Sequence, residues 1–253
     1  MFDTSPSPAV SGHSGIVPGV SSGRVSQARP VHGGLDPLLA RFGGGIRRRV
    51  RRGEYLFHCG ASFHALYGVR AGSFKSVLLT EDGREQVTGY HMAGEILGLE
   101  SIGSELCGSD AIALEDSEVI EIPFAELDAL ACRDAALQRE LFRLLAAEIQ
   151  RERGLMLLLG SMRAEERLAT FLLNLSKRLA ARGWSATHFI LRMTREEIGS
   201  LLGLKLETVS RILSRFQTEG LISVRNREIT IKRMDALKAV IGRADARREP
   251  EVS

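Results

Sequence analysis

The side chains with the clearest chemistry lie in the stretch "GLKLETVSRILSRF", residues 203–216. On a helix, Glu207, Ser210 and Arg211 would share one face, because they are three and four residues apart. Arginine can donate two hydrogen bonds to guanine, glutamate can accept one from cytosine, and serine can bond to a base or a phosphate. Since a carboxylate repels phosphate, Glu207 at the head of a basic helix favours readout of base sequence over nonspecific binding.

A simpler interpretation is that Glu207 and Arg211 form an ordinary surface ion pair, since they stand in the favourable order for one. The surrounding sequence has the pattern of a helix-turn-helix, described below, and this favours a role in DNA binding over a simple ion pair. We expect phosphate contacts from nearby cationic and hydroxyl side chains, namely Arg195, Lys205, Thr208 and Arg215. We expect the apolar residues of the stretch to form the opposite face of the helix: Leu206, Val209, Ile212, Leu213 and Phe216.

Two short helices and a hairpin must position this face. Thr194 and Glu197 form a capping-box pattern that starts the first helix, and Gly203 marks a short turn into the second. The second helix is expected to stop at Gly220, and the following "LISVRNREITIKR" indicates two strands joined by a turn at Asn226. Together these elements predict a winged helix-turn-helix domain over 161–236 and a C-terminal tail over 237–253.

Charge is distributed unevenly along the chain. Residues 161–253 contain 18 Lys and Arg against 11 Asp and Glu, a net charge of +7, whereas the rest has 16 against 20, or −4. A basic C-terminal third indicates a polyanionic partner. Chance clustering of solvated charges is the alternative that composition leaves open.

The first half of the chain has two patterns. Residues 1–34 are rich in Ser, Gly and Pro, which predicts a disordered tail. Residues 35–133 contain short apolar runs between glycine turns, which predict an antiparallel β-roll or jelly roll. "EDG" at 81–83 is typical of the turn between two such strands. With the helices that follow, the expected fold class is α+β.

After Pro123 the pattern becomes helical, and we expect residues 134–160 to form a long dimerisation helix. The alternative is a long helix that packs on its own domain. In a two-fold dimer Glu152 would lie near its twin, so the two carboxylates would repel each other. The seam of the predicted interface consists of Leu145, Ile149, Glu152, Met156 and Leu159.

Composition excludes several classes of protein. No apolar run approaches the length of a membrane span, and we find no signal-peptide pattern. Three widely spaced cysteines, Cys59, Cys107 and Cys132, fit a reducing cytoplasm better than a disulfide framework. A cupin-type metal enzyme is the alternative from another class. The scattered histidines lack the pairing that such a site needs, so we expect no enzyme.

The order of β-roll, long helix and winged domain resembles the cyclic-AMP receptor/fumarate-nitrate reductase regulator superfamily of bacterial transcription factors, and is closest to its anaerobic, oxygen-sensing branch. The resemblance covers about residues 35–240 and rests on 79–104, 121–131, 164–178, 193–204 and 207–222. It implies a homodimer that binds double-stranded DNA at TTGAT-type inverted repeats through Glu207, Ser210 and Arg211. The loop 80–86 resembles the family's surface for RNA polymerase, although an ordinary hairpin tip is equally consistent. The residues concerned are Thr80, Glu81, Asp82, Gly83, Arg84 and Glu85.

The chain differs from the oxygen-sensing branch in the residues that would sense the signal. The oxygen-sensing members hold a 4Fe–4S cluster on four cysteines, three near the N-terminus and one late in the β-roll. Here no cysteine precedes Cys59, and Ile120 stands at the late position, so we expect no cluster of the family type. The stretch that would hold the phosphate of a cyclic nucleotide, 99–110, has three acids and no basic residue, so we do not expect cyclic AMP as a ligand.

Other signals stay open. A thiol switch at Cys59, Cys107 or Cys132 is one alternative. Sensing of nitric oxide or redox state through a bound haem is another, although we expect His91 to be structural because "YHMAGE" recurs in family members that bind no haem. The conceivable haem ligands are His58, His64, His91, Cys59 and Cys107. We therefore predict a cytoplasmic regulator of anaerobic, microaerobic or respiratory genes, without an iron–sulfur cluster of its own.

Overall fold

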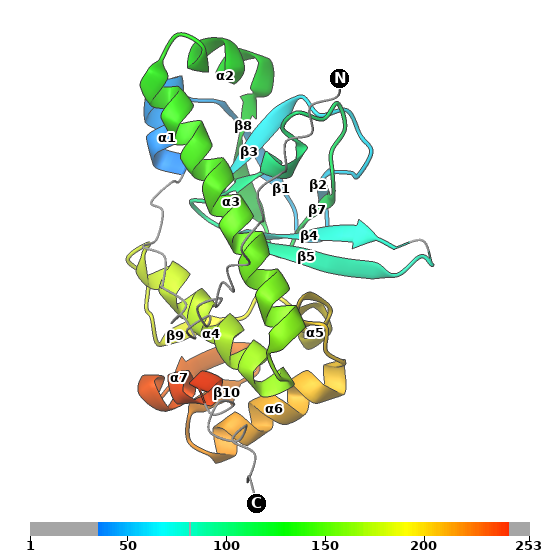
Figure 1. The fold of residues 1–253 in the computed structure, drawn as a ribbon, viewed down its shortest axis with the longest axis vertical. Helices are drawn as coiled ribbons and strands as arrows, with labels where there is room; N and C mark the ends of the chain where they lie inside the picture. Colours follow the sequence, from blue (N-terminus) through cyan, green and yellow to red (C-terminus); the bar gives the residue numbers. More distant parts are fainter. Residues whose placement is uncertain (1–34, 81, 243–253) are drawn as a thin grey trace, which may run out of the picture. The chain divides into compact units, whose positions relative to one another are not determined.

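The computed structural model describes residues 35–80 and 82–242 (Figure 1). The first part of these residues has two four-stranded antiparallel sheets, in the orders β1-β8-β3-β6 and β2-β7-β4-β5. This confirms the expected antiparallel β-roll. The strands are β1 Ile46–Val50, β2 Tyr55–Phe57, β3 Ala65–Ala71, β4 Ser73–Leu79, β5 Glu85–Met92, β6 Ile96–Leu97, β7 Asp110–Ala113 and β8 Ser117–Pro123.

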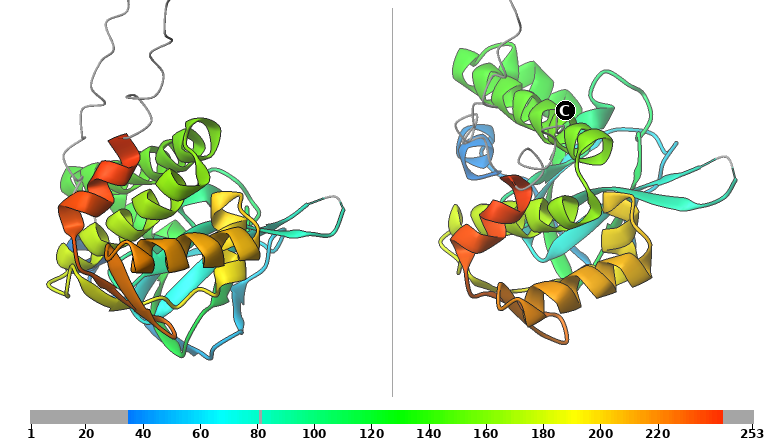
Figure 2. Two further views of the ribbon diagram at one scale, coloured as in Figure 1. Left: turned by 90° about the horizontal axis from the view of Figure 1, so that it is seen from below. Right: turned by 60° about the horizontal axis from the view of Figure 1, so that its bottom comes forward.

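Strands β4 and β5 form the predicted hairpin, which projects from its sheet (Figure 2). Its register places Val77 opposite Val87, and both side chains are buried. Gly83 in the turn has a φ of 78°, a left-handed conformation that glycine adopts without strain. The chain therefore reverses direction in a tight turn at the tip of the hairpin.

Four helical segments accompany the β-roll: α1 Leu35–Phe42, the 3₁₀ helix η1 Leu99–Ser101, α2 Phe124–Ala131 and α3 Ala135–Ser161. Helix α3 begins where the carboxylate of Asp134 accepts hydrogen bonds from the backbone of Ala136 and Leu137. Its 27 residues span about 40 Å. It runs where we expected the dimerisation helix.

The last part of the described chain contains α4 Ala164–Ala180, β9 His188–Ile190, α5 Arg195–Leu202, α6 Leu206–Thr218, β10 Ile222–Arg225, β11 Glu228–Ile231 and α7 Met234–Gly242. The expected wing hairpin is β10 and β11, with Asn226 in the left-handed conformation at its turn. Strand β9 adds a third strand beside β11. Its three residues are too few to give a periodic signal in the sequence.

The C-terminal boundary differs from the expectation. We expected a tail over 237–253, but residues up to Gly242 belong to α7. The helix continues because Leu237 is completely buried in the core of this domain, with Val240 and Ile241 packed against the same core. Residues 1–34, expected to be a disordered tail, and 243–253 lie outside the described residues. None of the described helices has the length and apolarity required to cross a membrane.

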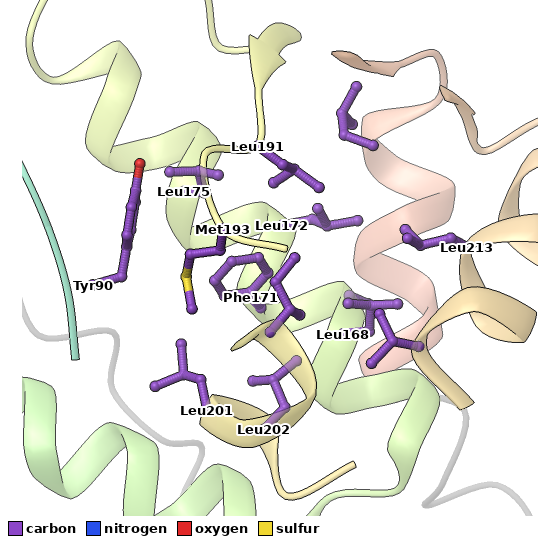
Figure 3. Close-up of a cluster of buried hydrophobic side chains, with 14 of the residues drawn as sticks. Tyr90, Leu168, Phe171, Leu172, Leu175, Leu191, Met193, Leu201, Leu202 and Leu213 are labelled. Atoms are coloured by element: carbon purple, nitrogen blue, oxygen red, sulfur yellow. The ribbon is translucent and has the colours of Figure 1, made fainter. Parts of the chain in front are cut away.

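One hydrophobic core joins the sheet β2-β7-β4-β5 to the C-terminal helices. Figure 3 shows Tyr90 of β5 beside Leu175 of α4 and Met193, which precedes α5. Leu201 and Leu202 of α5 lie in the same core. The position of the helix-turn-helix is therefore determined by its contacts with the β-roll as well as by packing within its own domain.

Candidate DNA-binding site

The predicted reading face lies on the solvent side of α6, the second helix of the helix-turn-helix. Glu207 and Arg211 are exposed, and Ser210 is half-buried. Within 35–80 and 82–242, no ion pair joins Glu207 to Arg211. Their polar groups thus remain available to a ligand on the outer side of the helix.

The opposite face of α6 anchors it to the domain. Every one of its apolar side chains is at most 4% exposed except Leu206, which is 44% exposed. The expectation for Leu206 was wrong because the first turn of α6 projects beyond the core, and its neighbours Lys205 and Glu207 are exposed too. The buried members are Val209, Ile212, Leu213 and Phe216.

The turn between α5 and α6 is fixed by local chemistry. The predicted capping box is present: the Thr194 hydroxyl accepts from the Glu197 amide at 3.1 Å, and the Glu197 carboxylate accepts from the Thr194 amide at 2.7 Å. Gly203 ends α5 in the left-handed conformation. At Gly199, a Cβ would lie 2.5 Å from the carbonyl oxygen of Leu204, so only glycine permits this close approach.

Arg167 is a residue that the sequence did not single out. Its guanidinium donates to three backbone carbonyls, those of Leu159 at 2.7 Å, Met162 at 2.9 Å and Leu202 at 3.0 Å. These carbonyls lie at the end of α3, just after it, and at the end of α5. A cation stabilises such helix ends because their carbonyls have no partner within the helix.

The predicted phosphate contacts have different surroundings. Lys205 is exposed just before α6, and Thr208 is half-buried. Arg195 donates from Nη1 to the Ser210 hydroxyl at 3.2 Å, which links a phosphate candidate to a base reader. Arg215 is held by two carboxylates: Glu219 at 2.8 Å, which contributes most to raising the pKa of Arg215, and Glu165.

The exposed face of α3 includes three of the five residues of the predicted seam. Ile149 and Met156 are 50% and 70% exposed, and Glu152 is exposed. Leu145 and Leu159 are instead partly buried against the cores of their own chain. Phe142, seven residues before Ile149, is 59% exposed and extends the apolar face. Counting back seven residues from Ile149 in the sequence leads to Phe142, so the repeat could have been found there.

The hairpin tip that resembles the polymerase-binding surface is tied together internally. The Thr80 hydroxyl donates to the Arg84 carbonyl at 2.9 Å, and Arg84 Nε donates to Asp82 at 2.6 Å. The bond from Arg84 contributes most to lowering the pKa of Asp82. Glu81 lies outside the described residues, while Gly83 and Glu85 are exposed.

The candidate haem ligands lie in unlike environments. His91 is buried, and its Nε2 lies 2.8 Å from the Ser76 hydroxyl. Burial is the main cause that lowers the pKa of His91 to about 3, so the ring is neutral near pH 7. His58 stacks on Tyr55 and His64 is exposed. The surroundings of His91 are those of a core histidine.

The cysteines do not fit the iron–sulfur cluster of the oxygen-sensing branch. Such a cluster takes four thiolates, and the chain has three cysteines. Cys59 and Cys132 are exposed, whereas Cys107 is buried, and burial raises the pKa of its thiol. Ile120, at the family's late cysteine position, is part of the β-roll core. Among the described residues, no group of three His, Cys, Asp or Glu is arranged to hold a metal ion.

Comparison with known proteins identifies the two domains. A cyclic nucleotide-binding domain model matches residues 47–134, and a Crp-like helix-turn-helix domain model matches 166–240. The chain is 45% identical over 208 residues to the fumarate and nitrate reduction regulatory protein of Salmonella typhimurium, covering 82% of this chain and 81% of the relative. It is 47% identical to the transcriptional regulatory protein btr of Bordetella pertussis, covering 82% and 84%.

The solved structures agree with this placement. The structure of FixK2 from Bradyrhizobium japonicum matches with a TM-score of 0.71 at 34% identity, covering 77% of this chain and 96% of that one. These relatives are regulators of transcription, and the helix-turn-helix with its exposed polar face is the part that binds DNA in such proteins. The chain is a DNA-binding transcription regulator and not an enzyme, and it belongs to the cyclic-AMP receptor/fumarate-nitrate reductase regulator superfamily, in its fumarate-nitrate type branch.

Proposed function

We propose that this regulator acts as a homodimer that reads a TTGAT-type inverted repeat and controls anaerobic, microaerobic or respiratory genes. The observation that carries the proposal is the position of Glu207, Ser210 and Arg211 on the solvent side of α6, opposite its buried apolar face. Arg211 suits guanine and Glu207 suits cytosine. Arg195, Lys205, Thr208 and, when released from its carboxylates, Arg215 bind phosphates and set the register of α6.

The gene class follows from the similarity to the fumarate and nitrate reduction regulatory protein. Because its partner is DNA, we also propose that the protein acts in the bacterial cytoplasm. The test is a competition gel shift at physiological salt, with a TTGAT palindrome and a scrambled palindrome of the same composition. We expect clear preference for the first, and equal affinity would refute sequence-specific reading of this repeat.

The proposed dimer forms through α3. Its apolar face, Phe142, Ile149 and Met156, is exposed in the single chain and repeats every seven residues, as in a helix pair. Arg151 is bonded to Glu148 on the same helix. In the proposed dimer Glu152 would face its twin across the two-fold axis, and Arg151 is already engaged by Glu148 rather than by Glu152.

The proposed contact with RNA polymerase is the hairpin tip, Thr80, Glu81, Asp82, Gly83, Arg84 and Glu85. Support comes from the projection of β4 and β5 from their sheet and from the internal bonds that fix the tip (Figure 2). A run-off transcription assay with Arg84→Ala tests it. We expect reduced transcription with unchanged DNA affinity.

The signal is proposed to reach the protein without a 4Fe–4S cluster, because the cysteines do not fit one. Absorption, iron and sulfide analysis of anaerobically purified protein tests this. Labile sulfide with a broad visible band would refute it, and a Soret band would favour the haem alternative. A featureless spectrum fits a thiol switch, with Cys59 as the exposed candidate in the β-roll, or control through the amount of protein.

A further inference from the structure

A buried carboxylate ties the β-roll to the DNA-binding domain. Glu95, in the turn between β5 and β6, is 7% exposed. Arg178 of α4 donates to it from Nε at 3.0 Å and from Nη2 at 2.6 Å. Arg182, in the turn just after the end of α4, donates from Nη2 at 2.8 Å. We call Glu95, Arg178 and Arg182 the clamp.

The clamp also holds the backbone of the turn. Arg178 donates to the carbonyl of Tyr90 and Arg182 to that of Ala93, each at 2.6 Å. Burial alone raises the pKa of Glu95, but the charges of the arginines, Arg178 first, overcome this and lower it to about 2. The carboxylate is therefore ionised and bonded on both oxygens, which makes the joint directional rather than a loose surface pair.

A second joint binds the β4–β5 hairpin to α5. Lys75 of β4 lies 2.9 Å from Glu197, the same glutamate that forms the capping box. The Val87 amide donates to the Ser200 hydroxyl at 2.8 Å, and the Gln86 side chain donates to the Ser200 carbonyl. The first two helices of the DNA-binding domain are thus each attached to the sheet β2-β7-β4-β5.

These joints determine where the reading helix can be. Helix α6 is fixed to α5 by the Gly203 turn and by their common core. In a dimer joined through α3, two copies of α6 would then be held at one distance and one rotation. Along B-DNA each added base pair moves a half-site by about 3.4 Å and rotates it by about 35°, so a rigid pair of readers fits one spacing.

We propose that the clamp of Glu95, Arg178 and Arg182 sets the half-site spacing that the dimer accepts. The inference rests on the proposed reading of an inverted repeat. It makes these three side chains positioning residues for DNA recognition, although none of them lies on α6. Their role is to act through α4 on the separation of the two reading faces.

The experiment measures affinity for TTGAT palindromes whose central spacer varies from about two to six base pairs. We expect wild-type protein to prefer one spacer about tenfold over its neighbours, and Glu95→Gln and Arg182→Met to reduce that preference below about threefold. Both variants should still prefer TTGAT half-sites over scrambled ones. The matched control is Arg70→Met, which removes a 3.1 Å ion pair with Glu118 inside the β-roll and should keep the wild-type profile.

The outcomes separate the two proposals. Lack of preference for TTGAT by wild-type protein would refute the proposed function. With that preference intact, an unchanged spacer profile in the clamp variants, or an equal loss at every spacer, would show a purely structural role and overturn the inference. If Glu95→Gln fails to fold, Arg182→Met decides, because its guanidinium lies nearer the surface, with 24% of the side chain exposed. Lys75→Met then tests the second joint in the same assay.

Discussion

The guanidinium of Arg195, at the first residue of α5, donates a hydrogen bond to the hydroxyl of Ser210 on α6 at 3.2 Å. The sequence suggested separate roles for these residues, one at a phosphate and one at a base. Their contact orients the Ser210 hydroxyl and keeps a positive charge beside the reading face. If Arg195 contacts a phosphate and Ser210 a base, as proposed, this bond would couple the two kinds of DNA contact.

Arg195→Ala is expected to alter both properties. Loss of one phosphate contact should reduce the slope of log affinity against log salt by about one. Loss of the bond to Ser210 should also weaken discrimination at the base pair that Ser210 reads. Ser210→Ala is the control, since it should change discrimination and leave the salt slope as it is. Binding titrations at several salt concentrations measure both quantities.

Arg211→Ala and Arg215→Ala should behave differently. Arg211 is exposed on the reading face, so its loss should cost about 1–3 kcal/mol and relax preference at one base pair. Arg215 lies further along α6 and is shared with Glu165 and Glu219, so its loss should weaken binding to all sequences alike. Gel shifts with single-base variants of the half-site compare them. The same uniform loss in both would mean that α6 is oriented differently on DNA.

Leu206 is expected to contact a thymine methyl group. Its exposed side chain stands beside Glu207 and one turn from Ser210, and apolar contact is how proteins sense this methyl group. Replacing thymine by uracil at one half-site position should then cost wild-type protein about fourfold in affinity. Leu206→Ala should be insensitive to the same replacement. Equal sensitivity of both proteins at every thymine would contradict this contact.

Met156→Glu should prevent dimer formation. The side chain is 70% exposed on the apolar face of α3, so the charge costs the single chain little. Across a two-fold interface it would add two buried carboxylates. Light scattering should report a monomer at concentrations where wild-type protein is a dimer. Leu106→Glu, at a β-roll residue that is 50% exposed, is the control and should remain dimeric.

His91 gives the fold a specific pH dependence. Its pKa is about 3 in the folded chain and about 6.5 in the unfolded one, so unfolding takes up a proton between these values. The contribution of His91 to stability is thus constant above about pH 6.5 and decreases below it, by at most about 1.4 kcal/mol per pH unit. Urea titrations between about pH 7 and 5 should show this slope in wild-type protein and in His64→Gln, and a smaller one in His91→Gln. An unchanged slope in His91→Gln would assign the proton uptake to another group.

Sequence alone was sufficient for the features that local patterns determine. Thr194, Glu197 and Gly203 fix the turn of the helix-turn-helix by capping and by backbone conformation, and both effects are written in short motifs. Exposure at the start of α6 was not predictable, because whether Leu206 is covered depends on how far the other helices extend. The clamp was missed for a similar reason. Glu95 and Arg178 are 83 residues apart, and only tertiary packing brings them together.

The three carbonyl contacts of Arg167 bear on how this domain can be exchanged between relatives. A recombination point between Leu159 and Arg167 would combine this arginine with the end of α3 from a different protein. A transplanted helix-turn-helix should therefore include the chain from Leu159 onward if the receiving protein is to keep these contacts between α3, α4 and α5. The segment that has to be exchanged as a unit is therefore longer than the DNA-binding domain itself.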